Sequence, residues 1–163
     1  MAKVGVLSDT HGVLLESVER FFEKCDYIIH AGDVGNIEIL NKLSKKAKLF
    51  AVFGNIDGRD VRSQCPEYQS FMIEDALILL MHIGGYPPKY NANSKLIIEK
   101  YKPDLFITGH SHILRVMYEK KYQHLYINPG AAGKFGFHTR ITAVRFDIHG
   151  KRFENLEVLD IVK

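Results

Sequence analysis

Five short apolar runs lie in the first two thirds of the chain, and each of them ends abruptly in polar residues. The runs comprise residues 4–7, 27–29, 49–53, 78–81 and 105–107. Short apolar runs bounded by turn residues are typical of buried strands, which occur in sheets covered on both faces. The pattern therefore favours a layered fold in which other elements cover the strands.

Helical patterns lie between several of these runs. Apolar residues recur on one helix face in 14–22, and again in 37–43 behind a predicted cap at Asn36. A third helix is predicted from about Ser94 to Tyr101, ended by Pro103. The first two thirds of the chain therefore reads as an alternating α/β unit.

After His112 the pattern changes to alternation and turns, which predicts added antiparallel strands. The last of these strands is expected after a turn at His149 and Gly150. No linker rich in Pro, Gly or Ser separates the two halves, and no internal repeat is present, so we predict a single domain over 1–163. The simplest architecture is an α/β fold with a pair of packed sheets flanked by helices.

Side chains of the types that bind metal ions follow each apolar run. The motifs are Ser8-Asp9-Thr10-His11-Gly12, Ala31-Gly32-Asp33, Gly54-Asn55, His82 and Gly109-His110-Ser111-His112. Taken alone, each is more often a cap, a turn or a core histidine than a ligand set. The carboxyl ends of strands in an open α/β sheet lie along one edge, so the ordered set of five favours one shared site.

The residue types in this set indicate which ions they suit. Carboxylate, amide and imidazole groups give mixed oxygen and nitrogen donors, which suit Mn, Fe, Co, Ni or Zn better than Ca or Mg. The predicted metal ligands are Asp9, His11, Asp33, Asn55, His82, His110 and His112. These are too many for one tetrahedral ion, and a carboxylate such as Asp33 can bridge two ions about 3.5–4 Å apart.

The ordered set DxH, GD, GN, H and GHSH, within a region from Val4 to about Asp147, resembles that of the calcineurin-like metallophosphoesterases. Among them it is most similar to the small single-domain phosphodiesterases of the YfcE type. The resemblance implies a four-layer αββα sandwich, with two mixed sheets flanked by helices. It also implies a first metal ion held by Asp9, His11 and His112, a second held by Asn55, His82 and His110, and a bridge through Asp33.

The activity implied by the resemblance is that of a dinuclear-metal-dependent phosphoesterase, and in particular a phosphodiesterase, in which a metal-bridging hydroxide attacks phosphorus. Asp33, Asn55 and His82 are the predicted catalytic residues. Mn²⁺ is the leading cofactor, and Ni²⁺, Fe²⁺, Co²⁺ or Zn²⁺ would suit the same donors. The predicted substrate is a small phosphate ester.

One position departs from the family pattern. Members carry histidine or cysteine directly after the motif asparagine, whereas this chain has Ile56, which cannot donate a proton. Help from a general acid is typically worth ~10²–10⁴ in rate. We therefore expect weak hydrolysis of alkyl monoesters and better hydrolysis of diesters with acidic leaving groups.

Other polar residues are expected to play smaller parts. His30 is predicted to be buried and to orient a ligand without binding metal. Asp57 is expected in an exposed loop and His124 in a surface turn. Three further residues could reach a phosphate only if their loop folds toward the site: Lys134, His138 and Arg140.

Charge and composition bound the partners and the compartment. The formal net charge is +3 without a run of like charges or a basic stripe, which disfavours nucleic acid as a partner. No secretory signal and no apolar stretch of roughly 18 residues is present, so we predict a cytoplasmic protein without membrane contact and with two free cysteines, Cys25 and Cys65. A homo-oligomer is compatible with the sequence. The competing interpretation is an interaction scaffold, because a retromer subunit shares this fold without full catalytic competence.

Overall fold

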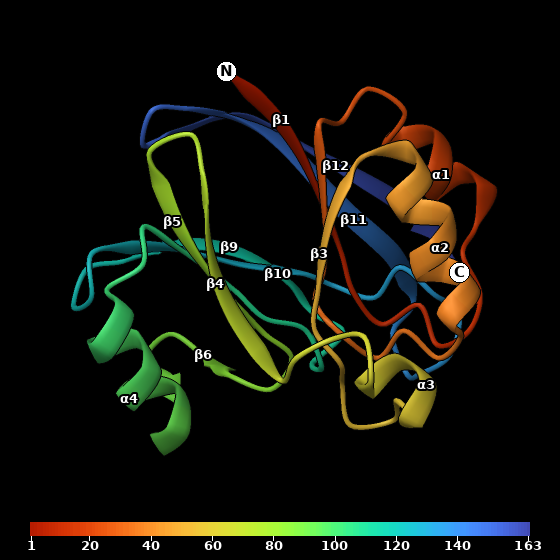
Figure 1. Cartoon of the computed structure of the whole chain (residues 1–163), viewed down its shortest axis with the longest axis horizontal. Coiled ribbons are helices and arrows are strands. Elements are labelled where there is room, and N and C mark those ends of the chain that lie inside the picture. The colour runs from red at the N-terminus through yellow and green to blue at the C-terminus, as the bar shows by residue number, and fades with distance from the viewer.

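The computed structural model describes residues 1–163 and contains two five-stranded sheets that pack against each other (Figure 1). Sheet A has the strand order β12-β11-β1-β2-β3, in which β1, β2 and β3 are parallel and β11 runs antiparallel to both β1 and β12. Its strands are β1 (Ala2–Leu7), β2 (Tyr27–His30), β3 (Lys48–Ala51), β11 (Arg140–His149) and β12 (Arg152–Val162). Sheet A is therefore mixed, with its parallel part built from the N-terminal third of the chain.

Sheet B has the order β4-β5-β8-β10-β9, with a parallel centre of β5, β8 and β10 and an antiparallel strand at each edge. Its strands are β4 (Tyr68–Ile73), β5 (Ala76–Met81), β8 (Leu105–Ile107), β9 (Leu114–Glu119) and β10 (His124–Pro129). A small hairpin of β6 (Gly85–Tyr86) and β7 (Lys89–Tyr90) follows β5. The antiparallel strands predicted after His112 are confirmed in both sheets.

Helices cover the outer faces of both sheets. Figure 1 shows α1 and α2 on the outer side of sheet A and α4 on the side of sheet B. The four helices are α1 (Glu16–Phe21), α2 (Ile37–Lys46), α3 (Arg59–Arg62) and α4 (Ala92–Tyr101). The Asn36 side chain accepts a hydrogen bond from the backbone of Glu38, so the predicted cap of α2 is confirmed.

Three apolar clusters separate the four layers. A cluster of 16 buried residues fills the space between the sheets, and one of 14 lies between sheet A and its helices. A smaller cluster of seven joins sheet B to α4. Alternation along β1 explains the division, because Val4 and Val6 belong to the central cluster whereas Leu7 belongs to the cluster under the helices. The expected αββα sandwich of two mixed sheets is thus confirmed.

Some elements were not predicted. The edge strand β4 was not predicted because most of its side chains are only half-buried, which weakens the apolar pattern in the sequence.

Cys25 and Cys65 are free thiols as expected, and burial raises the pKa of each to about 11. No helix is long and apolar enough to cross a membrane. The assignment of 1–163 to one domain stays a prediction.

Candidate metal centre

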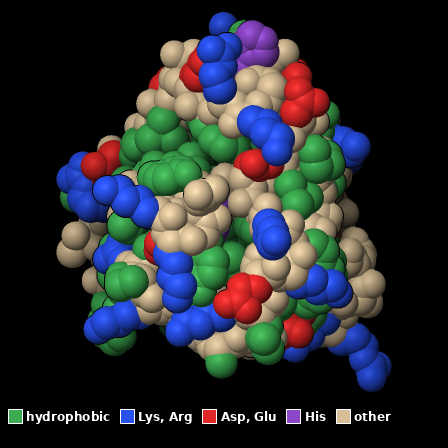
Figure 2. Space-filling view, turned by 90° about the vertical axis from the view of Figure 1, so that its left-hand side faces the viewer, with side chains coloured by type: hydrophobic (Ala, Val, Ile, Leu, Met, Phe, Trp, Pro, Cys, Tyr) green, Lys and Arg blue, Asp and Glu red, His purple; other side chains and the backbone are tan.

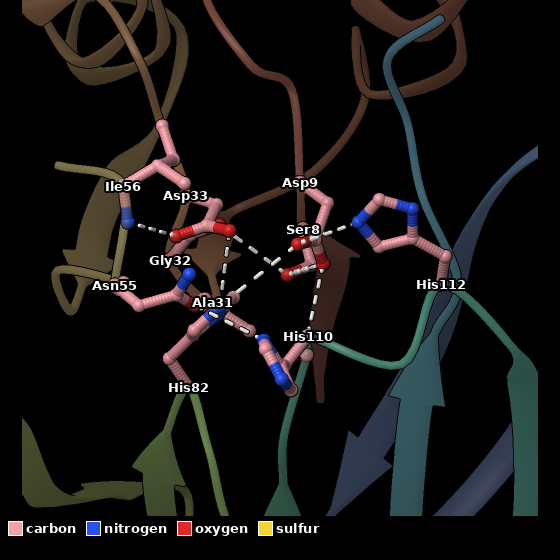
Figure 3. A network of polar contacts seen from close by, with 12 residues as sticks. Ser8, Asp9, Ala31, Gly32, Asp33, Asn55, Ile56, His82, His110 and His112 are labelled. Atoms are coloured by element: carbon pink, nitrogen blue, oxygen red, sulfur yellow. Dashed lines mark hydrogen bonds and ion pairs between the residues drawn. The ribbon is translucent and has the colours of Figure 1, made fainter. Parts of the chain in front are cut away.

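The structure brings all seven predicted ligands to one place, at the carboxyl ends of the central strands (Figure 3). Six of them form two triads, and within each triad the ligand atoms lie within 4.8 Å of one another. The first triad is Asp9, His11 and His112, and the second triad is Asp33, His82 and His110. Asn55 joins the second triad, because its Oδ1 lies 3.0 Å from both His82 Nε2 and His110 Nδ1. The expected cluster forms, but not at the edge of one sheet: Asp9, Asp33 and Asn55 follow strands of sheet A, whereas the histidines at 82, 110 and 112 follow strands of sheet B, so packing of the two sheets is also needed.

The backbone under the two triads is held in an unusual conformation. Non-glycine residues rarely have positive φ, yet five of the six triad residues do, with φ between 47° and 70°. These residues are Asp9, His11, Asp33, His110 and His112. Such positions cost of order 1–3 kcal/mol each and cluster where function needs a fixed geometry. The conformation turns short segments sharply, so that side chains two residues apart, such as Asp9 and His11, reach the same triad.

Two glycines allow backbone to approach the carboxylates closely. A Cβ added at Gly54 would collide with Asp33 Oδ1 and with the Asp33 backbone nitrogen. A Cβ added at Gly109 would meet Ser8 Oγ and would lie 3.0 Å from Asp9 Oδ2. The loops that carry Asn55 and His110 can therefore close onto the two carboxylates only with glycine at these positions.

Asp9 is fully buried and surrounded by donors. Its Oδ2 accepts hydrogen bonds from Ser8 Oγ at 2.6 Å and from the His110 backbone N–H at 3.1 Å. Its Oδ1 lies 3.1 Å from His112 Nε2 and 3.7 Å from His11 Nε2. Burial raises the pKa of this carboxyl, but the neighbouring histidines and Ser8 outweigh burial and hold it well below its usual range. Asp9 is thus an anion that is preorganised to face cations.

Asp33 belongs to the second triad and also faces the first. Its Oδ1 accepts the Ile56 backbone N–H at 3.1 Å, which leaves Oδ2 directed into the site. Oδ2 lies 3.3 Å from His82 Nε2 in the second triad and 3.6 Å from His11 Nε2 in the first. Burial raises the pKa of Asp33, and the His82 hydrogen bond and charge more than reverse this and lower it. Asp33 Oδ2 therefore faces a histidine of each triad.

His11 gives a direct test of whether the site fits a metal ion. Its Nε2 is buried and has no hydrogen-bond partner. A buried polar atom without a partner costs about 1–3 kcal/mol, so native proteins rarely retain one without use. This atom points at Asp9 and Asp33, and the Asp9 interaction raises the pKa of His11. A divalent cation bound by the two carboxylates would satisfy the orphan nitrogen.

Hydrogen bonds to the opposite ring nitrogens set the tautomers of two ligands. His82 Nδ1 lies 2.7 Å from the Ala31 carbonyl oxygen, so it carries the proton and leaves the Nε2 lone pair facing Asp33. Burial lowers the pKa of His82, but the interaction with Asp33 raises it by more, so the net shift of the pKa is upward. His82 is therefore oriented as a ligand by backbone.

His112 is oriented by another histidine. His138 Nε2 donates to the Gly133 carbonyl at 2.8 Å, which leaves His138 Nδ1 as an acceptor. His112 Nδ1 lies 3.1 Å from that acceptor, so it donates and leaves its own Nε2 free for the first triad. His138 thus contacts a ligand rather than phosphate, and Arg140 pairs with Asp160 at 2.7 Å. Sequence reasoning had no local signal for the His112 contact, because 26 residues separate the pair.

The environment of His30 agrees with its expected part. It is fully buried and contacts Thr10 Oγ1 at 3.0 Å, while the Gly32 backbone N–H donates to its Nδ1. Burial lowers the pKa of His30 to about 4, so the ring stays neutral. It fixes the two loops that carry the Asp residues without belonging to either triad.

Two expectations about surface residues were wrong. Asp57 is buried and accepts three backbone N–H bonds, from Val34, Gly35 and Gly54. It ties the Asp33 loop to the Asn55 loop, which is a use for a carboxylate that its loop sequence does not reveal. His124 is also fully buried, where its Nε2 meets Tyr90 Oη at 2.9 Å. Aromatic rings around it, rather than solvent, accommodate this histidine.

The sequence and the fold are both similar to those of known proteins. Residues 2–151 match the calcineurin-like phosphoesterase superfamily domain. A probable metallophosphoesterase of Methanocaldococcus jannaschii is 35% identical over 115 residues, which cover 67% of this chain and 58% of that relative. The match thus spans less than two thirds of the relative's length.

Solved structures agree in fold. Vps29 of Entamoeba histolytica complexed with zinc has a TM-score of 0.75 at 17% identity, with 98% of each chain covered. Yfce, a phosphoesterase from E. coli, has a TM-score of 0.63 at 20% identity, covering 95% of this chain and 98% of that one. At these identities the likeness concerns the fold alone.

Proposed function

The chain belongs to the calcineurin-like phosphoesterase superfamily, and from this premise we propose that it is a phosphodiesterase that works with two divalent cations. The observation that carries the proposal is the position of Asp33 Oδ2, within 3.6 Å of histidine nitrogens from both triads. One shared carboxylate oxygen between two complete triads is the arrangement expected of a dinuclear centre. The superfamily implies a divalent metal ion, and we propose Mn²⁺ because the donors combine oxygen and nitrogen.

Each triad has a defined part in the proposal. Cations held by the two triads would supply the positive charge that neutralises phosphoryl oxygens and lowers the pKa of water. Asp9 and Asp33 stay ionised because their pKa values are lowered, so both are ready to bind cations at neutral pH. Asn55 and His82 share a contact of 3.0 Å, which places a neutral amide oxygen beside the second triad.

The side chain after Asn55 decides which esters can react. Ile56 is 46% exposed beside the site, and its backbone N–H is committed to Asp33. An isoleucine side chain has no proton to give to a departing alkoxide. Esters with acidic leaving groups do not need that proton, so phosphodiesters of this kind are the proposed substrates.

The competing proposal is an interaction scaffold of the same fold. The structure of Chaetomium thermophilum Vps29 has a TM-score of 0.78 to this chain. Its sequence identity is only 14%, so the likeness concerns the fold alone. The presence of all seven candidate ligands favours an enzyme, because a scaffold has no need of the left-handed backbone under them. A cytoplasmic location, the absence of nucleic-acid binding and any homo-oligomer stay predictions.

The experiment is a hydrolysis assay of the purified chain on bis(p-nitrophenyl) phosphate. We expect turnover with Mn²⁺, none with excess chelator, and a loss of about 10³-fold in Asp33→Asn, which removes the shared charge. Asp75→Asn is the matched control, because Asp75 is exposed in the turn between β4 and β5, at the opposite end of β5 from His82. Hydrolysis that neither chelator nor Asp33→Asn reduces would refute the proposal.

A further inference from the structure

Exposed apolar side chains follow the candidate ligands directly in the sequence. Val13 comes two residues after His11, and isoleucine comes immediately after each of Asn55, His82 and His112. Four large apolar side chains are therefore anchored beside the two triads, with exposed fractions between 45% and 59%, and they are Val13, Ile56, Ile83 and Ile113. Single exposed apolar residues are ordinary, but a group of them around one polar centre marks a binding surface.

Two phenylalanines extend this apolar surface on the side of the first triad. Phe135 is 70% exposed and its ring centroid lies 5.2 Å from that of His11, while Phe137 is fully exposed. The loop that carries them is fixed, because Lys163 Nζ donates to the Gly136 carbonyl at 2.6 Å and to the His138 carbonyl at 3.2 Å. The structure thus holds the ring of Phe135 in solvent next to His11, with a second exposed ring, Phe137, two residues further along the same loop.

A pocket lies on the opposite side, next to the second triad. It has a volume of about 230 Å³ and opens beside Asn55 and His82. Its apolar wall is made of Phe53, Met81 and Ile83. Drug-sized ligands occupy pockets of roughly 300–1,000 Å³, so this space suits one ring or one short chain.

The polar wall of this pocket is held by Arg62. Its guanidinium lies 4.4 Å from the centroid of the Phe53 ring, and its Nε donates to the Asp57 carbonyl at 2.6 Å. These contacts fix the plane of the guanidinium, and because its partners are a ring and neutral carbonyls, Arg62 keeps its positive charge in the pocket wall.

Charged side chains near the triads are Arg62 and Glu67, which line the pocket beside the second triad. The ion pairs of Asp9 and Asp33 involve histidines only. On the side of the molecule that carries α4, by contrast, Lys and Arg side chains stand between separate hydrophobic patches (Figure 2). On the side of the first triad, a charged substrate group would lose hydration against the exposed ring of Phe135.

We propose that the site selects phosphodiesters with an apolar or aromatic group on each ester oxygen. One group would lie against Val13, Ile113, Phe135 and Phe137, and the other in the pocket beside Asn55. The inference rests on the proposed phosphodiesterase activity, since the triads must hold the phosphate between these two surfaces. It assigns to the exposed apolar residues the recognition of substrate rather than of a partner chain.

The kinetic test compares two diesters with the same leaving group, bis(p-nitrophenyl) phosphate and methyl p-nitrophenyl phosphate. They differ in intrinsic reactivity, so the informative quantity is how a substitution changes the ratio of their kcat/KM values. In the double variant Phe135→Ser, Phe137→Ser we expect the aryl-to-methyl ratio to fall about tenfold, because one ring loses its apolar contact. Leu156→Ser on the edge strand β12, which is 42% exposed and lies outside the site, is the control and should keep the wild-type ratio.

A binding measurement without turnover separates this inference from the proposed function. Calorimetry of the Mn²⁺-loaded chain should show diphenyl phosphate binding about tenfold more tightly than dimethyl phosphate, and the double variant should lose that preference. Equal affinities for the two diesters in the wild-type chain would overturn the inference, whether or not hydrolysis is seen. Absence of chelator-sensitive hydrolysis, with the binding preference intact, would instead count against the phosphodiesterase proposal alone.

Discussion

The Nδ1 atoms of His112 and His138 lie 3.1 Å apart, and His138 Nε2 donates a hydrogen bond to the Gly133 carbonyl. This chain of bonds places a proton of His112 on Nδ1, so its Nε2, which lies 3.1 Å from Asp9 Oδ1, is the nitrogen that would face a cation. His138 is thereby a positioning residue, which acts on the first triad through the ring that it holds.

We expect His138→Ala to weaken cation binding by 10- to 100-fold, because loss of such outer contacts typically has this effect. Calorimetric titration with Mn²⁺ measures it. His138→Gln can keep an acceptor near His112 and should recover part of the affinity, whereas His149→Ala, at the exposed last residue of β11, should change nothing. Unchanged affinity in His138→Ala would show that His112 is oriented without it.

Gly54→Ala should disturb the candidate metal centre, because the loop backbone at Gly54 lies directly against Asp33. The new methyl group would collide with Asp33, so we expect a loss of about 1–3 kcal/mol in the free energy of unfolding and weaker cation binding. Gly58→Ala, four residues further on, is the matched control, because its Cβ would meet only Asp60 Oδ1 at 3.6 Å. The control should lie within about 0.5 kcal/mol of wild type in urea unfolding. Equal stability of the two variants would contradict the close approach of Gly54 to Asp33.

Ile56→His should extend the range of leaving groups. The substitution places a proton donor beside Asn55 while keeping the backbone N–H that binds Asp33. We expect the hydrolysis of alkyl diesters to rise toward the ~10²-fold end of general acid contributions, with much less change for p-nitrophenyl esters. A wild-type chain that already turns over alkyl and aryl diesters at equal rates would show that no such donor is missing.

Stability should depend on pH through buried His124. Burial lowers its pKa to about 4, against about 6.5 in an unfolded chain. Between these values the unfolded chain binds a proton that the folded chain does not, so stability falls as pH falls from 6.5 toward 4, by up to about 3 kcal/mol. Urea unfolding from pH 4 to 7 should show a shallower acid decline in His124→Gln. Parallel curves for the two proteins would mean that His124 does not titrate in this way.

The layers and the seven candidate ligands could be predicted because both depend on local signals. Short apolar runs indicate buried strands, and strand direction brings Asp9 and Asp33 to one edge of sheet A, whereas His82 reaches them from sheet B only through the packing of the two sheets. The parts of Asp57, His124 and His138 could not be predicted in the same way. Each depends on a contact across 22 or more residues, such as Asp57 with the Gly35 backbone, Tyr90 with His124, and His112 with His138. Pairings of this length arise from tertiary packing and leave no trace in neighbouring residues.

The exposed apolar residues beside the site could not be predicted from the sequence either. Phe135 and Phe137 are apolar residues that sequence patterns would place in a core, yet the fold leaves them in solvent. Only the structure shows that Phe135 lies beside His11. Exposure therefore carries functional information that hydrophobicity alone conceals.

The central claim is that the two triads seat two cations that share Asp33. Crystals of the chain grown with Mn²⁺ and measured for anomalous scattering test it most directly. The account predicts two anomalous peaks about 3.5–4 Å apart, one at each triad, with Asp33 Oδ2 in contact with both. A single peak, or peaks away from Asp9 and Asp33, would contradict it.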